Sequence, residues 1–190
     1  MKRCSWCGED PLYVRYHDEQ WGVPVYDDKE LFAQLILEGA QAGLSWITIL
    51  RKKEGYYRAF DGLTPEIMAL YQETKIQELL EDEGIVRNKL KIRAAVTNAQ
   101  AYLKLTEEEG SFSNFLWSFV AQDGRESNFQ SKKEPIVNSP ESDKMSKELK
   151  KRGFKFVGST ICYAFMQAVG MVNDHDLDCF RYKEVAIITK

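Results

Sequence analysis

The chain contains only two histidines, His17 and His175, and each lies near a cysteine in the sequence. Cys4 precedes His17 by thirteen residues, and Cys179 follows His175 by four. Two thiolates and two imidazoles form a donor set that suits tetrahedral zinc. Because no donor is left for an open coordination position, such a site would be structural. It would tie the N-terminal segment to the C-terminal tail.

The same residues allow other interpretations. The split spacing matches no standard zinc finger, so the thiols could be free and the histidines could bond locally. Cys4 and Cys7 form a short pair of their own, which lets Cys7 compete for the fourth ligand position. His175 and Cys179 would share one face only if their stretch is helical. Cys162 lies in an apolar stretch and is expected to be an inert core residue.

A second group of chemically capable residues is an acid among aromatic side chains. Glu38 follows three apolar residues and precedes Gly39. A carboxylate buried there needs a partner or has a shifted pKa, and it would favour a cationic ring. Stacking on a nucleobase is worth about 1–3 kcal/mol per base. The alternatives are an exposed glutamate at a helix end and ordinary core aromatics. The aromatic candidates are Trp6, Tyr13, Tyr16, Trp21, Tyr26 and Trp46.

The stretch from Glu83 to Lys89 predicts a turn between two helices. Gly84 permits a tight turn close to a phosphate. Backbone amides at the start of the second helix, with Arg87 and Lys89, would bind that phosphate without reading base sequence. The plainer interpretation is that Gly84 only ends a helix.

Hydrophobic periodicity and capping residues predict helices throughout, and no alternating strand pattern is present. We therefore expect an all-α fold. Residues 122–139 are polar without periodicity and are expected to form a long loop. Helices are expected after Asp27-Asp28, Ser45 and Thr64, at Thr74 as a capping box with a stop at Gly84, and over residues 88–105, 111–120, 140–152 and 159–169.

Composition fits a cytoplasmic globular protein. The 190 residues carry 26 basic and 29 acidic side chains, and 44% of the residues are apolar. No apolar run approaches the ~18 residues that span a bilayer, and the first residues do not resemble a signal peptide. Basic residues gather in residues 51–53, 85–106 and 144–155. These windows indicate either a polyanion-binding face or solvated helix faces.

Long collinear stretches resemble one family, the 3-methyladenine DNA glycosylase I (Tag-type) enzymes of bacterial base-excision repair. The resemblance extends from Cys4 to about Cys179, which makes it far more specific than any short motif above. The matching stretches are residues 10–13 (DPLY), 16–24 (YHDEQWGVP), 37–46 (LEGAQAGLSW), 116–120 (LWSFV), 146–158 (SKELKKRGFKFVG) and 172–175 (VNDH).

The resemblance implies an all-α, helix-hairpin-helix DNA glycosylase fold in a single unit over residues 1–190. Its helical body would cover about residues 27–170. The terminal segments, about 1–26 and 171–190, would be tied by one structural zinc. The ligands implied by position are Cys4, His17, His175 and Cys179.

It also implies roles in the binding of a flipped adenine. Glu38, as the catalytic residue, and Tyr16 would bind the edge of the base, and Trp46 would stack on it. Tyr13, Trp6 and Trp21 would complete the pocket. The remaining roles concern DNA: Gln41, Gly43 and Leu44 would approach the gap left by flipping, and Gly84, Ile85, Arg87 and Lys89 would grip the backbone.

The activity implied is hydrolysis of the N-glycosidic bond of 3-methyladenine in double-stranded DNA. We expect a monofunctional, monomeric enzyme without an organic cofactor or a membrane partner, associated with the bacterial nucleoid through its substrate. Many enzymes of this superfamily carry a catalytic Asp after the hairpin, whereas residues 84–122 contain none and Glu107 to Glu109 are expected to form a surface turn. Cys7 and the apolar run Val185–Ile188 depart from the family pattern.

Two other classes of protein are compatible with parts of this pattern. A zinc-stapled DNA-binding module would use the hairpin and the basic windows but would give Glu38 no role. A thiol- or metal-dependent hydrolase would use Cys4 or Cys7 and would need an open zinc position or a reactive thiolate. Base release separates the first from a glycosylase, and loss of activity on chelation or thiol alkylation identifies the second.

Overall fold

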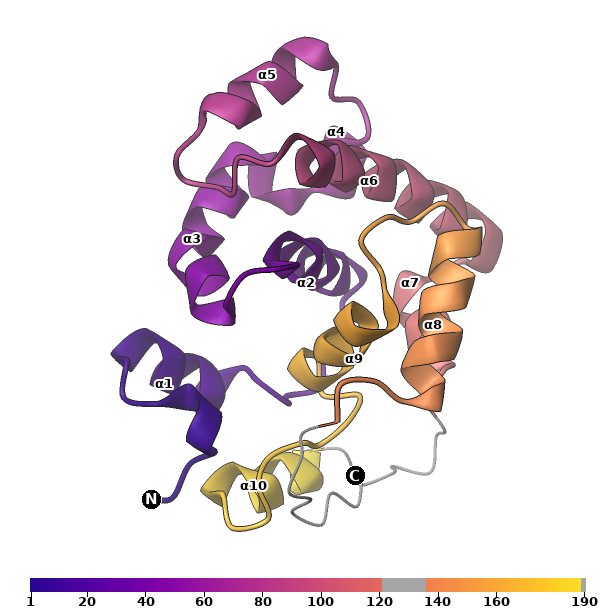
Figure 1. The fold of residues 1–190 in the computed structure, drawn as a ribbon. Helices are drawn as coiled ribbons and strands as arrows, with labels where there is room; N and C mark the ends of the chain where they lie inside the picture. The colour runs from indigo at the N-terminus through magenta and orange to yellow at the C-terminus, as the bar shows by residue number, and fades with distance from the viewer. Residues whose placement is uncertain (121–135, 189–190) are drawn as a thin grey trace.

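The computed structural model describes residues 1–120 and 136–188, with the side chains of residues 187 and 188 left out. All regular elements within these ranges are helices, which confirms the predicted all-α class (Figure 1). Two short 3₁₀ helices cover Ser5–Cys7 and Asp61–Leu63. The α-helices are α1 (Pro11–Glu19), α2 (Asp28–Gln41), α3 (Trp46–Ala59), α4 (Pro65–Met68), α5 (Glu73–Glu81), α6 (Lys89–Glu109), α7 (Phe112–Trp117), α8 (Pro140–Lys151), α9 (Ser159–Ala168) and α10 (Phe180–Ile188).

Helix α2 lies at the centre of the molecule (Figure 1). It begins at the predicted cap, where the Asp27 carboxylate accepts hydrogen bonds from the amides of Lys29 and Glu30. Most of residues 31–40 are buried, because α3, α6, α7 and α9 surround the helix. A helix that is apolar all round belongs in a core. Its C-terminal turn, which carries Glu38, is therefore held rigidly by the packing around it.

Other helix starts agree with the capping pattern. Ser45 precedes α3, and the Asn88 side chain accepts hydrogen bonds from the amides of Leu90 and Lys91 at the start of α6. The mostly apolar helix α9 is largely buried, as expected. Residues 136–139 of the predicted long loop contain no helix, and residues 121–135 lie outside the described part of the chain.

Two local predictions are wrong. The capping box at Thr74 does not form, because α5 begins at Glu73 with Gln72 as its cap and Thr74 lies inside the helix. Glu107 to Glu109 do not form a surface turn but are the last turn of α6, which continues past Leu105 and ends at Gly110 in the left-handed conformation. They are exposed at that helix end.

The N-terminal residues lie against the start of α10 (Figure 1). The amide of Phe180 donates a hydrogen bond to the carbonyl of Lys2 at 3.0 Å, and the Lys2 ammonium pairs with Asp178. The N-terminal segment contains a well-capped helix, since α1 has Asp10 as a cap and Pro11 in its first position. Among the described residues, no helix combines the length and hydropathy needed to cross a bilayer.

Candidate active site and metal centre

The side chains predicted to form a base pocket line one cavity of about 510 Å³. Trp6 comes from the first 3₁₀ helix, Tyr13 and Tyr16 from α1, and Trp21 from the segment after α1. Glu38 and Gln41 reach the cavity from the end of α2, and Trp46 reaches it from the start of α3. A space of this size suits a small flat ligand. Tyr26 is not among the lining residues, and its ring stacks on Trp117.

The rings of the cavity pack edge to face and tilted. The Trp6 ring centroid lies 5.1 Å from that of Tyr13 and 4.8 Å from that of Trp21, and Tyr16 lies 5.5 Å from Trp46. Tyr16 and Trp46 are buried, whereas Trp6 is partly exposed at the rim. The indole nitrogen of Trp46 is buried without a hydrogen-bond partner at normal geometry among the described residues.

Glu38 is buried, with only 3% of its surface exposed. Its Oε1 accepts a hydrogen bond from the Gln34 amide at 2.8 Å, one turn earlier in α2. Burial raises the pKa of Glu38 to about 8, and the bond from Gln34 offsets this only in part. The alternative of an exposed helix-end glutamate is therefore wrong. In the empty cavity the acid is mostly neutral at pH 7, and a cation entering the cavity would favour its ionisation.

The opposite wall of the cavity holds a second carboxylate that the sequence analysis did not single out. Asp174 lines the cavity, and its Oδ2 accepts hydrogen bonds from the Tyr163 hydroxyl and the Gln167 amide, both at 2.7 Å. Asp174 belongs to the stretch beside His175, and Gln167 lies on the buried helix α9. No local pattern marks these residues, because they meet only through the packing of α9 against the segment before α10.

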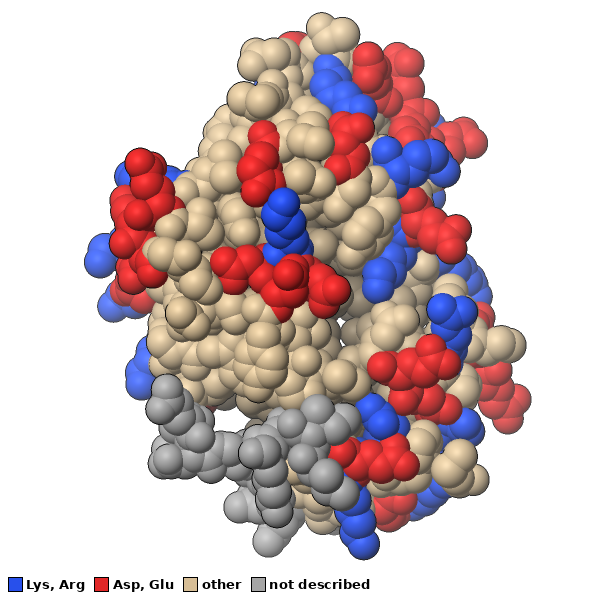
Figure 2. Space-filling model, turned by 180° about the vertical axis from the view of Figure 1, so that it is seen from behind, with Lys and Arg blue, Asp and Glu red and all other residues tan. Residues whose placement is uncertain are grey.

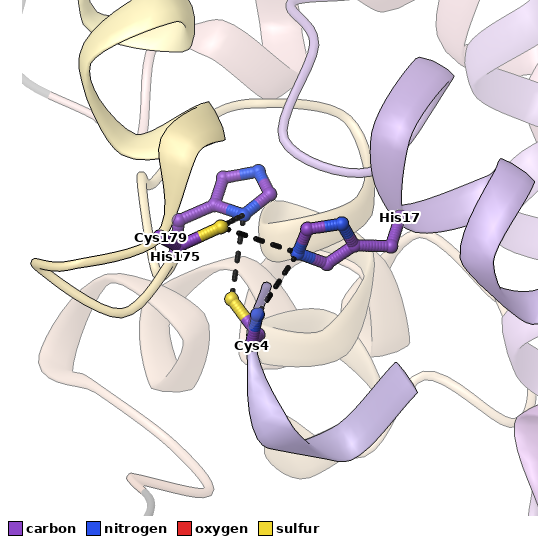
Figure 3. Close-up of side chains that lie close together, drawn as sticks. All are labelled: Cys4, His17, His175 and Cys179. Atoms are coloured by element: carbon purple, nitrogen blue, oxygen red, sulfur yellow. Dashed lines mark hydrogen bonds between the residues drawn. The ribbon is translucent and has the colours of Figure 1, made fainter. Parts of the chain in front are cut away.

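The four predicted metal ligands converge on one point (Figure 3). Their ligand atoms all lie within 4.8 Å of one another, and all four residues are buried. The Cys4 Sγ lies 3.5 Å from the His175 Nδ1, and the Cys179 Sγ lies 3.4 Å from the His17 Nε2 and 3.7 Å from the His175 Nδ1. Tetrahedral zinc with arms of about 2.3 Å to sulfur and 2.05 Å to nitrogen gives a sulfur–nitrogen separation of about 3.6 Å. The four residues fit such an ion.

The surroundings of the four residues also fit a cation. The outer nitrogen of His17 lies 2.8 Å from Asp18, whose carboxylate is held in turn by Arg3. The outer nitrogen of His175 lies 3.2 Å from the Trp21 carbonyl. Such second partners orient imidazole ligands. Without a cation, burial raises the pKa of the Cys4 thiol and lowers that of His175 to about 4.

The structure decides two alternatives that the sequence leaves open for the Cys/His group. The stretch from His175 to Cys179 is not helical, so these residues meet through a turn and not on one helix face. Cys7 is not among the four, because its thiol donates to the Cys4 carbonyl at 3.3 Å. Cys162 is a fully buried core residue, as expected.

The Cys/His group and the cavity share a wall. The Trp21 ring lies 4.6 Å from the His175 ring, and the Trp6 ring lies 5.4 Å from the His17 ring. Trp6 and Trp21 therefore contact the cavity on one side and the Cys/His group on the other. The contacts that hold the His17 and His175 rings in place therefore also position the Trp6 and Trp21 rings.

The predicted hairpin is present between α5 and α6. Gly84 is not in the left-handed conformation, and a Cβ at this position would first meet the Arg58 and Asp82 side chains. The close backbone approach to α3 constrains Gly55, where a Cβ would run into the Gly84 carbonyl. The Tyr56 hydroxyl accepts a hydrogen bond from the Val86 amide at 3.2 Å. Ile85 is buried, so only its backbone can face a ligand, whereas Arg87 and Lys89 are exposed.

The loop from α2 to α3, residues 41–45, exposes the residues predicted to face a DNA gap. Gly43 has a φ of 78°, and 40% of the Leu44 surface is exposed. The ammonium of Lys91 on α6 donates to the carbonyls of Ala40 and Ala42 on either side of Gln41. In the sequence Lys91 is only one member of a basic window. Its contacts could not be predicted, because the two carbonyls lie about fifty residues away.

Much of the basic character is paired with nearby acids. Arg93 pairs with Glu73 at 2.6 Å, and Arg152 pairs with Glu108 at 3.0 Å. On the face opposite to that of Figure 1, acidic and basic side chains are interspersed (Figure 2). That face does not present a field of one sign. Solvated helix faces therefore account for part of the predicted windows.

A helical body with an acid inside an aromatic cavity, and a hairpin beside it, is the architecture of a helix-hairpin-helix DNA glycosylase. The family described as methyladenine glycosylase matches residues 6–182. The chain belongs to this family.

Known relatives cover nearly the whole chain. DNA-3-methyladenine glycosylase 1 of Escherichia coli is 48% identical over 182 residues, which are 96% of this chain and 97% of the relative. DNA-3-methyladenine glycosylase of Haemophilus influenzae is 43% identical, over 93% of this chain and 96% of the relative. A solved structure of 3-methyladenine DNA glycosylase I from Staphylococcus aureus, concerned with 3-methyladenine recognition, has a TM-score of 0.88 and 41% identity, over 95% of this chain and 96% of that one.

Proposed function

We propose that the chain hydrolyses the N-glycosidic bond of 3-methyladenine in alkylated double-stranded DNA, which releases the free base and leaves an abasic site. The observation that carries this proposal is the buried Glu38 in a cavity walled by aromatic rings. The base leaves the duplex stack to reach the cavity, at a cost of a few kcal/mol that is smaller for a damaged base.

The chemistry of the cavity suits a cationic adenine. Methylation at N3 places a positive charge on the base in DNA. Burial keeps Glu38 neutral by raising its pKa, and a cationic base beside it lowers that pKa, so Glu38 becomes negatively charged when the base is bound. Its carboxylate also accepts a hydrogen bond from the exocyclic amino group, beside Tyr16. Trp46 supplies a stacking ring, with Tyr13, Trp6 and Trp21 closing the cavity.

The leaving group explains why a strong acid is not needed. A base that is already cationic departs without protonation, so the site needs to recognise the charge and hold the base in place. Glu107 to Glu109 are exposed at the end of α6 and do not line the cavity. We therefore propose a monofunctional hydrolase without a lysine nucleophile or lyase step, in which Glu38 is the catalytic residue.

Contacts to DNA are assigned to two segments. In the loop from α2 to α3, Gln41, Gly43 and the exposed Leu44 would approach the gap left by the flipped base. In the hairpin, exposed Arg87 and Lys89 would bind phosphates and position the duplex without reading sequence. Gly84 and Ile85 would contribute backbone only, because a Cβ on Gly84 would meet Arg58 and the Ile85 side chain is buried.

We also propose that Cys4, His17, His175 and Cys179 hold one structural zinc ion. The thiolate and imidazole donors and their separations support this choice of metal. With four protein ligands, zinc has no open position and supplies a fixed cross-link between the chain ends.

The activity is tested by base release from methylated duplex DNA, resolved by chromatography. The variants are Glu38→Ala and, as a matched control on an exposed position of α2, Glu30→Ala. We expect the wild type and the control to release 3-methyladenine but not 7-methylguanine. We expect Glu38→Ala to be slower by about 10²-fold or more. Equal release by Glu38→Ala would refute the role of Glu38. Duplex binding without any base release by the folded wild type would favour a binding module.

A further inference from the structure

Lys91 connects two segments that are far apart in the sequence. It lies in the first turn of α6, directly after the hairpin of residues 82–88. Its side chain reaches the end of α2, where Nζ donates to the Ala40 carbonyl at 2.8 Å and to the Ala42 carbonyl at 2.6 Å. No other described side chain is recorded to bond these two carbonyls.

The end of α2 needs such a partner. The last carbonyls of a helix have no intrahelical donor, and a cation there also interacts favourably with the helix dipole. At Ala42 the backbone leaves helical geometry, with φ of −43° and ψ of 116°, and Gly43 follows in the left-handed region. Lys91 is only partly exposed, and burial lowers the pKa of its ammonium. Because its ammonium is partly buried and donates to two carbonyls, the Lys91 side chain is held in one position, unlike an exposed surface lysine. We call this link between α6 and the end of α2 the Lys91 brace.

The two bonds lie beside the functional residues. The carbonyls of Ala40 and Ala42 flank Gln41, which lines the cavity, and Gly43 and Leu44 come next. At the other end of the brace, the Asn88 side chain accepts a hydrogen bond from the Lys91 amide at 3.1 Å and so fixes the start of α6 to the end of the hairpin. One side chain thus joins the segment that would hold the DNA backbone to the segment that would fill the DNA gap.

We propose that Lys91 is a positioning residue that sets the loop of residues 41–45 in register with the hairpin of residues 82–88. The loop then enters the gap while the hairpin holds the strand. This inference rests on the proposed function. It assigns Lys91 to the recognition of DNA with a flipped or missing base, not to the binding of phosphate.

The test compares Lys91→Met, which removes the donor, with Lys91→Gln, which keeps an uncharged donor. Lys89→Met is the matched control, because Lys89 is exposed on the same turn of α6. Each protein is titrated with an intact duplex and with a duplex containing a stable abasic analogue, from about 50 to 200 mM salt. Binding of free 3-methyladenine is followed by tryptophan fluorescence, and its retention reports a folded cavity.

For Lys91→Met we expect the affinity for the abasic duplex to fall by about tenfold or more. Its affinities for the intact duplex and for the free base should stay within about twofold of those of the wild type. Lys91→Gln should recover most of the loss. Lys89→Met should weaken both duplexes equally and reduce the salt slope by about one. Equal loss on both duplexes with a reduced salt slope for Lys91→Met would overturn the proposal in favour of a phosphate contact, and wild-type affinities throughout would also overturn it.

Two further outcomes are separable. If Lys91→Met does not fold, Lys91→Ala, which also removes the donor, takes its place: a selective loss on the abasic duplex supports the brace, and wild-type affinity for both duplexes or an equal loss on both refutes it. If the wild type shows neither free-base binding nor a preference for the abasic duplex, the proposed function itself fails, and the brace as a device for gap recognition fails with it.

Discussion

The buried acid gives a prediction about stability that requires no substrate. Glu38→Gln replaces a carboxyl by an amide of nearly the same shape, and its carbonyl oxygen can still accept the hydrogen bond from Gln34. The variant lacks only the ionisable proton. Any dependence of its stability on pH that differs from wild type therefore reports on Glu38 alone.

The sign follows from proton binding. In the folded chain the Glu38 pKa is about 8, against an ordinary value of 4.5. Between these values the unfolded chain binds fewer protons than the folded chain, so the wild-type unfolding free energy falls as pH rises. At ~1.4 kcal/mol for each tenfold change in proton affinity, the loss from one end of this window to the other is at most ~5 kcal/mol.

The measurement is urea denaturation of wild type and Glu38→Gln at intervals from pH 4.5 to 8.5, with Glu30→Gln as the control. We expect the Glu38→Gln variant to gain on wild type steadily as pH rises, by several kcal/mol at the alkaline end. The exposed control should keep a constant difference. Parallel stability curves for wild type and Glu38→Gln would refute the assignment of a raised pKa to Glu38.

Three more predictions follow from described contacts. Trp46→Phe keeps an aromatic side chain but removes the indole N–H and part of the stacking surface, so free 3-methyladenine should bind about threefold to tenfold more weakly in a fluorescence titration. An unchanged affinity would mean that no ligand acceptor meets this nitrogen. Chelation, or Cys179→Ser, should lower the free energy of unfolding by ~4 kcal/mol if metal is present at a thousand times its Kd. Cys7→Ser, outside the Cys/His group, should retain metal, and equal metal content in both variants would contradict the ligand assignment. Gly55→Ala should cost about 1–3 kcal/mol in urea denaturation, because its Cβ would push on the Gly84 carbonyl. No loss would show that the hairpin shifts freely.

The sequence was informative where a feature is local. The cap at Asp27 and the apolar run before Glu38 predicted the helix α2, because periodicity and capping act within a few residues, whereas the burial of Glu38 was left open between two alternatives. The rarity of histidine made the Cys/His group visible, since only two histidines could take part. The pocket residues came from the density of aromatics and from the family resemblance together.

Features set by tertiary contact escaped sequence reasoning. Gly55 is required because its backbone passes close to the Gly84 carbonyl, and nothing near Gly55 in the sequence shows this. The Lys91 bonds and the Asp174 cluster likewise join distant segments. The local pattern at Thr74 is a good capping box, but α5 begins at Glu73 with Gln72 as its cap, so Thr74 lies inside the helix and cannot cap it.

The shared wall between the Cys/His group and the cavity restricts how this protein can change its substrate by mutation. Trp6 and Trp21 each contact two neighbours, the cavity proposed to hold the base and a histidine ring of the Cys/His group. A substitution at either position that reshapes the cavity also disturbs the tie between the chain ends. Tyr13 and Trp46 lie on the cavity without a recorded ring contact to either histidine. Changes of base preference are therefore accessible from their side of the cavity, and the side that is backed by the Cys/His group is the part that variation must preserve.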